Sequence, residues 1–194
     1  MKPQPGGSSP TGRDRLDLVA EQVQLQDVDG NITRRPVSHF LALSVNGRSL
    51  ADFLLHGGDF VTNLNRAWSP GVVPEAVSIF LGTAQEPDLD SGRIPLLVCA
   101  ACGDIGCGAL TAALTLTEET VTWAGFRWAD WSAELRPVEG LPDEMCFDRA
   151  QYEEEFEHAV ARVRELPYDE EEHKLRRFLW PWQWGWRLPP RNEE

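Results

Sequence analysis

Apolar and polar residues alternate along residues 109–117, near the middle of the chain. Leu110, Ala112, Leu114 and Leu116 occupy every second position, and threonine or alanine stands between them. A period of two places successive side chains on opposite faces of a strand. A strand is therefore predicted here, although several of these residues are good helix formers.

A second strand is predicted over residues 120–128, after a polar turn at Glu118-Glu119. Its large apolar residues are Val121, Trp123, Phe126 and Trp128. Their spacing shifts by one residue at Ala124-Gly125, as a β-bulge would shift it. The two strands are thus predicted to form an antiparallel hairpin with a bulge in the second strand.

The apolar run 94–99 precedes this hairpin and is predicted to be a third strand. Residues 100–108 connect it to the hairpin and include Gly103, Gly106 and Gly108. Because glycine tolerates positive φ, these residues predict a tight connection, with Gly106 in that conformation.

Further elements are predicted on the N-terminal side. Strands at about 16–27 and 31–45 flank Asp29-Gly30, a pair typical of hairpin turns. A short helix is expected to begin after Ser49 as its N-cap. Residues 74–82, with proline at the start and glycine at the end, favour a second helix.

The longest predicted helix runs from Asp148 to about Glu165. Its apolar stripe consists of Tyr152, Phe156, Ala159, Val160 and Val163. An amphipathic helix of this kind packs its stripe on the core. The predicted fold class is therefore α+β: an antiparallel sheet of hairpins with a long C-terminal helix packed on it.

The 194 residues, 42% of them hydrophobic, are enough for one domain with a sizeable core. Residues 1–13 are rich in proline, glycine and serine and are predicted to be a disordered tail. Residues 14–179 are expected to form the single α+β domain, and residues 180–194 a Trp-rich C-terminal tail.

Charge restricts the classes of partner. The formal net charge of −13 argues against nucleic acid, which proteins bind through lysine and arginine. Residues 139–172 hold thirteen acidic residues against three arginines, whereas residues 173–191 hold five Lys and Arg residues and no acidic one. No apolar run approaches the roughly eighteen residues of a transmembrane segment, and we expect a cytoplasmic protein.

Three of the four cysteines lie close together as Cys99-x2-Cys102-x4-Cys107. This spacing suits a tetrahedral metal such as zinc, and Cys146 is the candidate for a fourth thiolate. A second close pair, as in zinc ribbons, is missing, and strand alternation would separate Cys99 from Cys102 unless the chain has already turned.

Two other interpretations of the cysteines stay open. The favoured one is that they are ordinary small buried side chains. The other is a reversible disulfide between Cys102 and Cys107, which flank the four residues 103–106.

Common catalytic motifs are missing. The glycines of residues 103–108 follow the order G-x-x-G-x-G and lead into a strand, which does not fit a dinucleotide fingerprint or a P-loop. G-x-S-x-G and H-E-x-x-H are absent from the sequence.

The C-terminal tail is the candidate interaction surface. Trp180, Trp182, Trp184 and Trp186 alternate next to Arg176 and Arg177. If the tail is extended, these tryptophans would display their indoles to a protein partner or to a second copy of the chain. If the tail folds back onto the domain, the tryptophans would instead complete the protein's own core.

Three motifs together resemble a family of uncharacterised bacterial proteins. They are the run Val98-Cys99-Ala100-Ala101-Cys102-Gly103-Asp104-Ile105-Gly106-Cys107-Gly108, then Val121-Thr122-Trp123-x-x-Phe126, then Phe147-Asp148-Arg149-Ala150-x-Tyr152. The resemblance covers about 95–155 and implies no activity.

The sequence thus favours a small acidic cytosolic protein that acts as an interaction or regulatory module without catalysis. The alternatives are a zinc-stabilised binding module that uses the cysteines and a thiol-dependent oxidoreductase.

Overall fold

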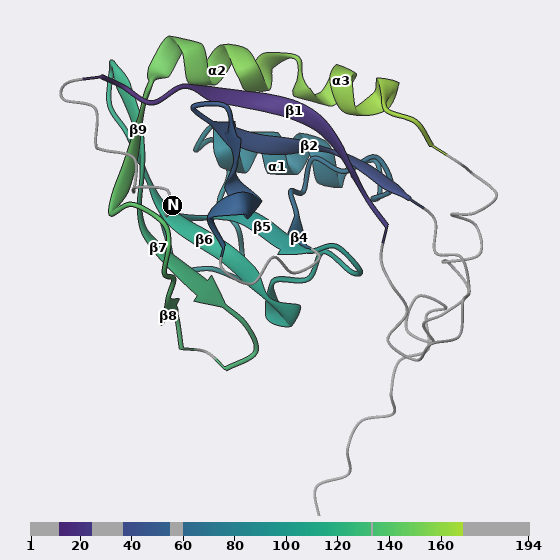
Figure 1. Cartoon of the computed structure of the whole chain (residues 1–194), viewed down its shortest axis with the longest axis horizontal. Helices are drawn as coiled ribbons and strands as arrows, with labels where there is room; N and C mark the ends of the chain where they lie inside the picture. Colours follow the sequence, from purple (N-terminus) through teal and green to yellow (C-terminus); the bar gives the residue numbers. More distant parts are fainter. Residues whose placement is uncertain (1–11, 25–36, 55–59, 133, 169–194) are drawn as a thin grey trace, which may run out of the picture.

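The computed structural model describes residues 12–24, 37–54, 60–132 and 134–168. In these residues the chain forms two antiparallel sheets and three α-helices (Figure 1). The predicted turn at Asp29-Gly30 lies outside the described residues.

The smaller sheet has the strand order β1-β2-β3. Its strands are β1 (Leu16–Val23), β2 (Ser38–Val45) and β3 (Arg48–Ser49). The 3₁₀ helix η1 (Leu50–Phe53) follows, and Ser49 at its N-cap position makes no side-chain capping bond, contrary to the prediction.

The larger sheet has the order β4-β5-β6-β7-β8, and β9 also pairs with β7. Its strands are β4 (Phe60–Val61), β5 (Arg93–Cys99), β6 (Ala109–Leu116), β7 (Thr120–Ala129), β8 (Arg136–Pro137) and β9 (Glu144–Asp148). The predicted β6–β7 hairpin is confirmed. The register shifts where Thr111 and Ala113 face β7, and Gly125 has a φ of +57°, so the predicted bulge is confirmed as well.

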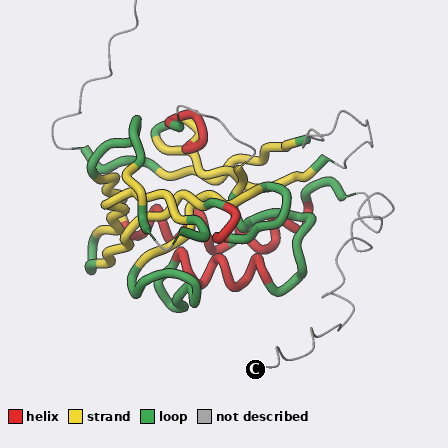
Figure 2. Tube along the Cα trace, turned by 90° about the horizontal axis from the view of Figure 1, so that it is seen from below, coloured by secondary structure: helices red, strands yellow, loops and turns green. Residues whose placement is uncertain are grey.

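The helices are α1 (Val72–Phe80), α2 (Arg149–Glu157) and α3 (Ala159–Glu165), and Figure 2 shows them on one side of the strands. The prediction of a helix near 74–82 is confirmed by α1. The predicted fold class is wrong: the protein is mostly sheet, arranged as two sheets, and it has no long C-terminal helix packed on a single sheet in its described residues.

The predicted long helix is interrupted at His158, which has a φ of −103° and a ψ of 2°. The break leaves two helices of nine and seven residues. The predicted face is nevertheless correct, because Tyr152, Phe156, Ala159 and Val163 are all buried and Val160 is partly buried against the core.

Helix side chains cover the edge of β1. The backbone N–H of Leu16 donates to Gln151 Oε1 at 3.2 Å, and the N–H of Leu18 donates to Glu155 at 3.0 Å. Gln151 and Arg162 donate in turn to the carbonyl oxygens of Leu16 and Leu18. An open strand edge invites pairing with other chains, and these side chains block it.

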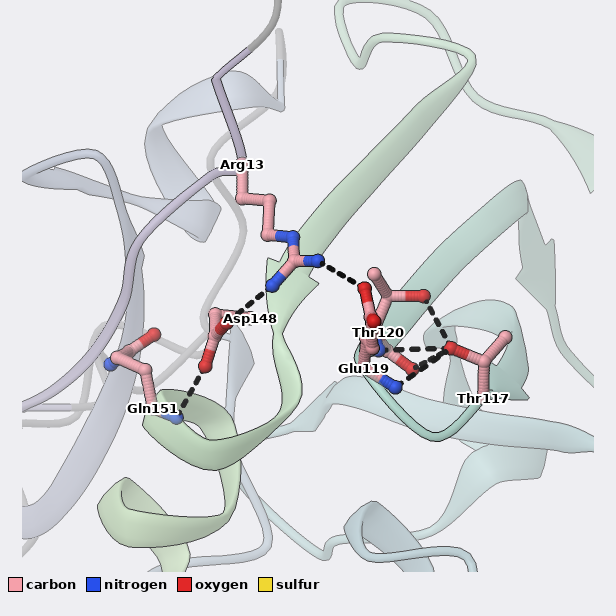
Figure 3. A network of polar contacts seen from close by, with 6 residues as sticks. All are labelled: Arg13, Thr117, Glu119, Thr120, Asp148 and Gln151. Carbon is pink, nitrogen blue, oxygen red and sulfur yellow. Dashed lines mark hydrogen bonds and ion pairs between the residues drawn. The ribbon is translucent and has the colours of Figure 1, made fainter.

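Arg13 ties the start of the described chain to α2 and to the β6–β7 turn (Figure 3). It pairs with Asp148 and, at 3.1 Å, with Glu119. Asp148 also accepts from the N–H of Gln151, which makes it the N-cap of α2. The exposure of these groups limits the contribution of the ion pairs to stability.

Aromatic rings form the centre of the core. The largest fully buried side chains are Trp123, Tyr152, Phe80, Phe147 and Phe156. Trp123 Nε1 donates to the hydroxyl of Tyr152 at 3.3 Å, and that hydroxyl donates to the carbonyl oxygen of Phe80 at 3.0 Å. One hydrogen-bonded chain therefore links β7, α2 and α1 inside the core.

Candidate metal centre

The first two cysteines are brought together by a tight turn at the end of β5. Cys99 is the last residue of that strand, and the backbone N–H of Gly103 donates to the Cys99 carbonyl oxygen at 2.8 Å. Gly103 has a φ of +72°, a conformation in which glycine is favoured. Because the chain has already turned, Cys99 and Cys102 do not point to opposite faces of a strand.

A short 3₁₀ helix, η2 (Ile105–Cys107), brings in the third cysteine. The Asp104 carboxylate accepts from the N–H of Gly106 at 2.7 Å, and the N–H of Cys107 donates to the Asp104 carbonyl oxygen at 3.2 Å. Asp104 thus fixes both ends of this turn.

The Sγ atoms of Cys99, Cys102 and Cys107 all lie within 4.8 Å of one another. Four ligands at about 2.3 Å around a tetrahedral metal place sulfur atoms about 3.8 Å apart, so small side-chain rotations suffice to bind one ion. Cys102 and Cys107 are exposed and Cys99 is half-buried, so the favoured interpretation as ordinary buried side chains is wrong.

The three thiols differ in acidity. Burial raises the pKa of Cys99, but hydrogen bonds from the Ala101 N–H, from the Cys107 thiol and from the Cys102 N–H outweigh it and lower that pKa overall. Desolvation and then the charge of Cys99 raise the pKa of Cys102 to about 12. The hydrogen bond to Cys99, followed by desolvation, also raises the pKa of Cys107.

A negative charge on the Cys99 sulfur therefore raises the pKa of the other two thiols, which makes a second and a third thiolate harder to form. A divalent cation reverses this effect, because a coordinated thiol loses its proton. Among the three thiols, only that of Cys99 has a lowered pKa, and with a bound cation the cluster can supply three thiolates.

Cys146 does not belong to this cluster. It lies on β9 opposite Thr122, and Thr122 in turn pairs with Thr115 of β6. Residues 99–108, the cysteine loop, adjoin the other end of β6, at Ala109. Six residues of strand, about 20 Å, therefore separate Cys146 from this loop. The predicted fourth thiolate is therefore not brought to the site.

Two tryptophans pack against glycines of the loop. A Cβ atom at Gly103 would lie 1.3 Å from the ring of Trp68, and one at Gly108 would lie 2.9 Å from the ring of Trp128. Only a residue without a side chain allows indoles this close to the backbone. Trp68 therefore packs on the loop at Gly103, and Trp128 packs on it at Gly108.

A third tryptophan packs against Gly106, where the prediction of a positive φ is wrong. A Cβ at Gly106 would lie 2.6 Å from the ring of Trp131. The backbone N–H of Trp131 also donates to the Gly106 carbonyl oxygen at 3.0 Å. Gly106 is thus required by the close approach of a ring, although Trp131 itself is 79% exposed.

These three tryptophans were not predicted as part of the site. Trp68 lies about 35 residues before the loop in sequence, and Trp128 and Trp131 lie about 20 to 25 residues after it. The one available signal was the glycine content of the loop, since glycines in a tight connection also permit close packing.

The predicted interaction residues Trp180, Trp182, Trp184, Trp186, Arg176 and Arg177 lie outside the described residues. In the part of the chain that the structure describes, no helix combines the length and hydrophobicity needed to cross a membrane.

No protein-family model, curated protein or solved structure matches the chain.

Proposed function

We propose that the protein is a metal-binding module in which the thiolates of Cys99, Cys102 and Cys107 bind one zinc ion. The observation that carries this proposal is the convergence of three sulfur atoms within 4.8 Å. Zinc is the metal of choice because thiolates are soft ligands and the ion accepts tetrahedral geometry without strain.

The geometry of the turn supports this proposal. Hydrogen bonding from the backbone N–H groups of Ala101 and Cys102 lowers the pKa of the Cys99 thiol. Such bonds stabilise a thiolate before any metal arrives and orient it once one is bound, as outer hydrogen bonds do around metal ligands generally.

A thiol-dependent oxidoreductase is the second candidate, because Cys102 and Cys107 are both exposed and close. A disulfide needs two sulfur atoms, however, and here three converge. The third sulfur has a role in a metal site and none in a simple reversible disulfide.

Serine substitutions test the proposal. Binding of about 10–16 kcal/mol divided over four ligands gives about 3 kcal/mol for each, or about a 100-fold change in affinity. We therefore expect Cys99→Ser, Cys102→Ser and Cys107→Ser each to weaken zinc binding by about 100-fold or more. Competition with a zinc-sensitive dye measures the affinity.

Cys146→Ser is the matched control, because it removes a half-buried cysteine of the same sheet outside the cluster. It should bind one zinc ion with unchanged affinity. A wild-type protein that binds no zinc, or a Cys99→Ser variant that binds it normally, would contradict the metal proposal. A variant lacking Cys99 that still forms a Cys102–Cys107 disulfide reversibly would favour the oxidoreductase.

A further inference from the structure

The cysteine loop is held in place by bonds that need no metal. Gly103 donates to the Cys99 carbonyl oxygen at 2.8 Å, Gly106 to the Asp104 carboxylate at 2.7 Å, and Gly108 to the Ile105 carbonyl oxygen at 3.0 Å. None of these bonds uses a thiol, so the loop keeps its shape when the ion leaves.

The hydrophobic core is also independent of the cluster. Its largest members, Trp123 and Tyr152, are joined by hydrogen bonds between β7, α2 and α1. Cys99 is the last residue of β5, and Cys102 and Cys107 lie in the connection from β5 to β6, where both are exposed. This differs from small zinc domains, in which metal binding supplies the energy of folding.

The described residues supply three ligands for a metal ion. Among the described residues, only Cys99, Cys102 and Cys107 form a group of metal ligands, and a tetrahedral ion takes four. Cys99 is the half-buried ligand and Cys102 and Cys107 are the exposed ones, so a ligand from outside would reach a bound ion from the side of Cys102 and Cys107. A three-ligand site with an open fourth position admits a ligand from outside.

From the preformed loop, the exposed sulfurs and the open position we infer that this is a transfer site, which exchanges its ion with a thiolate ligand of a second molecule. This inference rests on the proposed function. A thiolate partner is favoured over a carboxylate because soft ligands compete best for an ion held by sulfur.

The exchange step involves no change of oxidation state. The sulfur of the incoming thiol bonds to the ion at the open position, and its proton passes through solvent to the sulfur of Cys107. The bond between the ion and Cys107 then breaks. Cys102 and Cys99 follow in the same way as further donor thiols bind, so every bond and proton lost on one side is gained on the other.

Stopped-flow kinetics test the inference with the full chain. The zinc-loaded protein is mixed with the chromophoric chelator 4-(2-pyridylazo)resorcinol at a series of glutathione concentrations, and colour records the zinc released. If thiolates enter the open position, the rate doubles when glutathione is doubled. A methylated glutathione, which has no thiol, is the control and leaves the rate unchanged.

The second measurement is circular dichroism of the zinc-free protein, which should retain the spectrum and cooperative unfolding of the loaded one. A release rate independent of glutathione would overturn the inference, because it indicates a closed coordination sphere. A zinc-free chain that is unfolded would overturn it too. Both results leave stoichiometric zinc binding, and thus the proposed function, intact, whereas a protein that binds no zinc fails the proposed function itself.

Discussion

Replacing Gly103 with alanine is expected to destabilise the protein more than the same change at any open glycine. The left-handed backbone at a φ of +72° costs alanine about 1–2 kcal/mol. The added Cβ would also lie 1.3 Å from Trp68, so the ring or the loop must move, at about 1–3 kcal/mol more. Urea unfolding of the zinc-free protein measures the loss.

Gly92→Ala is the matched control for this prediction. Gly92 has a φ of +79°, and a Cβ there would meet no atom within 4 Å, so this variant carries the backbone cost alone. In a Trp68→Ala background, Gly103→Ala should cost no more than Gly92→Ala does. Equal costs at the two glycines in the wild-type background would show that Trp68 does not hold the loop.

The Gly103→Ala variant should also bind zinc more weakly. The turn at Gly103 sets the distance between Cys99 and Cys102, and outer-sphere changes of this kind typically cost about 10–100-fold in metal affinity. Gly92→Ala should leave the affinity unchanged.

Trp123→Ala is expected to have the largest effect on folding, about 3–5 kcal/mol, because it empties the centre of the aromatic core. The indole is fully buried, and its ring centroid lies 4.8 Å from that of Phe147. Its hydrogen bond to Tyr152 is lost as well, which leaves a buried hydroxyl with one partner fewer. The fall in the free energy of unfolding is read from urea titrations in the presence of a zinc chelator.

Two further variants separate the contribution of the buried hydrogen bonds from that of burying the indole. Tyr152→Phe removes the hydroxyl alone and should cost about 1–3 kcal/mol, since Phe80 then keeps an unpaired buried carbonyl. Trp131→Ala removes the same side chain from a position that is 79% exposed and should change stability by about 0.5 kcal/mol or less. Comparable losses for Trp123→Ala and Trp131→Ala would contradict the assignment of the core.

The elements with strong local periodicity were predictable. Alternation between Leu110 and Leu116 predicted β6, and the shift at Ala124-Gly125 predicted the bulge, because both signals are carried by neighbouring residues. The helix near Pro74 follows from terminal proline and glycine in the same way.

The architecture was not predictable from the same signals. Nothing in the local pattern separates the hairpin of β1 and β2 from the larger sheet, since pairing between distant strands leaves no periodicity in either one. The stripe from Tyr152 to Val163 indicated the buried face of a helix, yet the break at His158 does not disturb that stripe and so was missed.

The candidate site was also predictable only in its local part. The spacing of Cys99, Cys102 and Cys107 indicated a cluster within one loop, because nine residues of turn keep their sulfur atoms near one another. The assignment of Cys146 needed the register of β7 and β9, which the sequence does not reveal. The contact of Trp68 with Gly103 depends on the fold as a whole.

X-ray absorption at the zinc edge of the loaded protein, in a buffer free of thiols and chloride, tests the central claim most directly. Three converging thiolates and an open fourth position predict three sulfur neighbours at about 2.3 Å and one oxygen or nitrogen neighbour at about 2.0–2.1 Å. The Cys146→Ser variant should give the same spectrum. A first shell of only oxygen and nitrogen neighbours, or of four sulfur neighbours, would contradict the three-cysteine site.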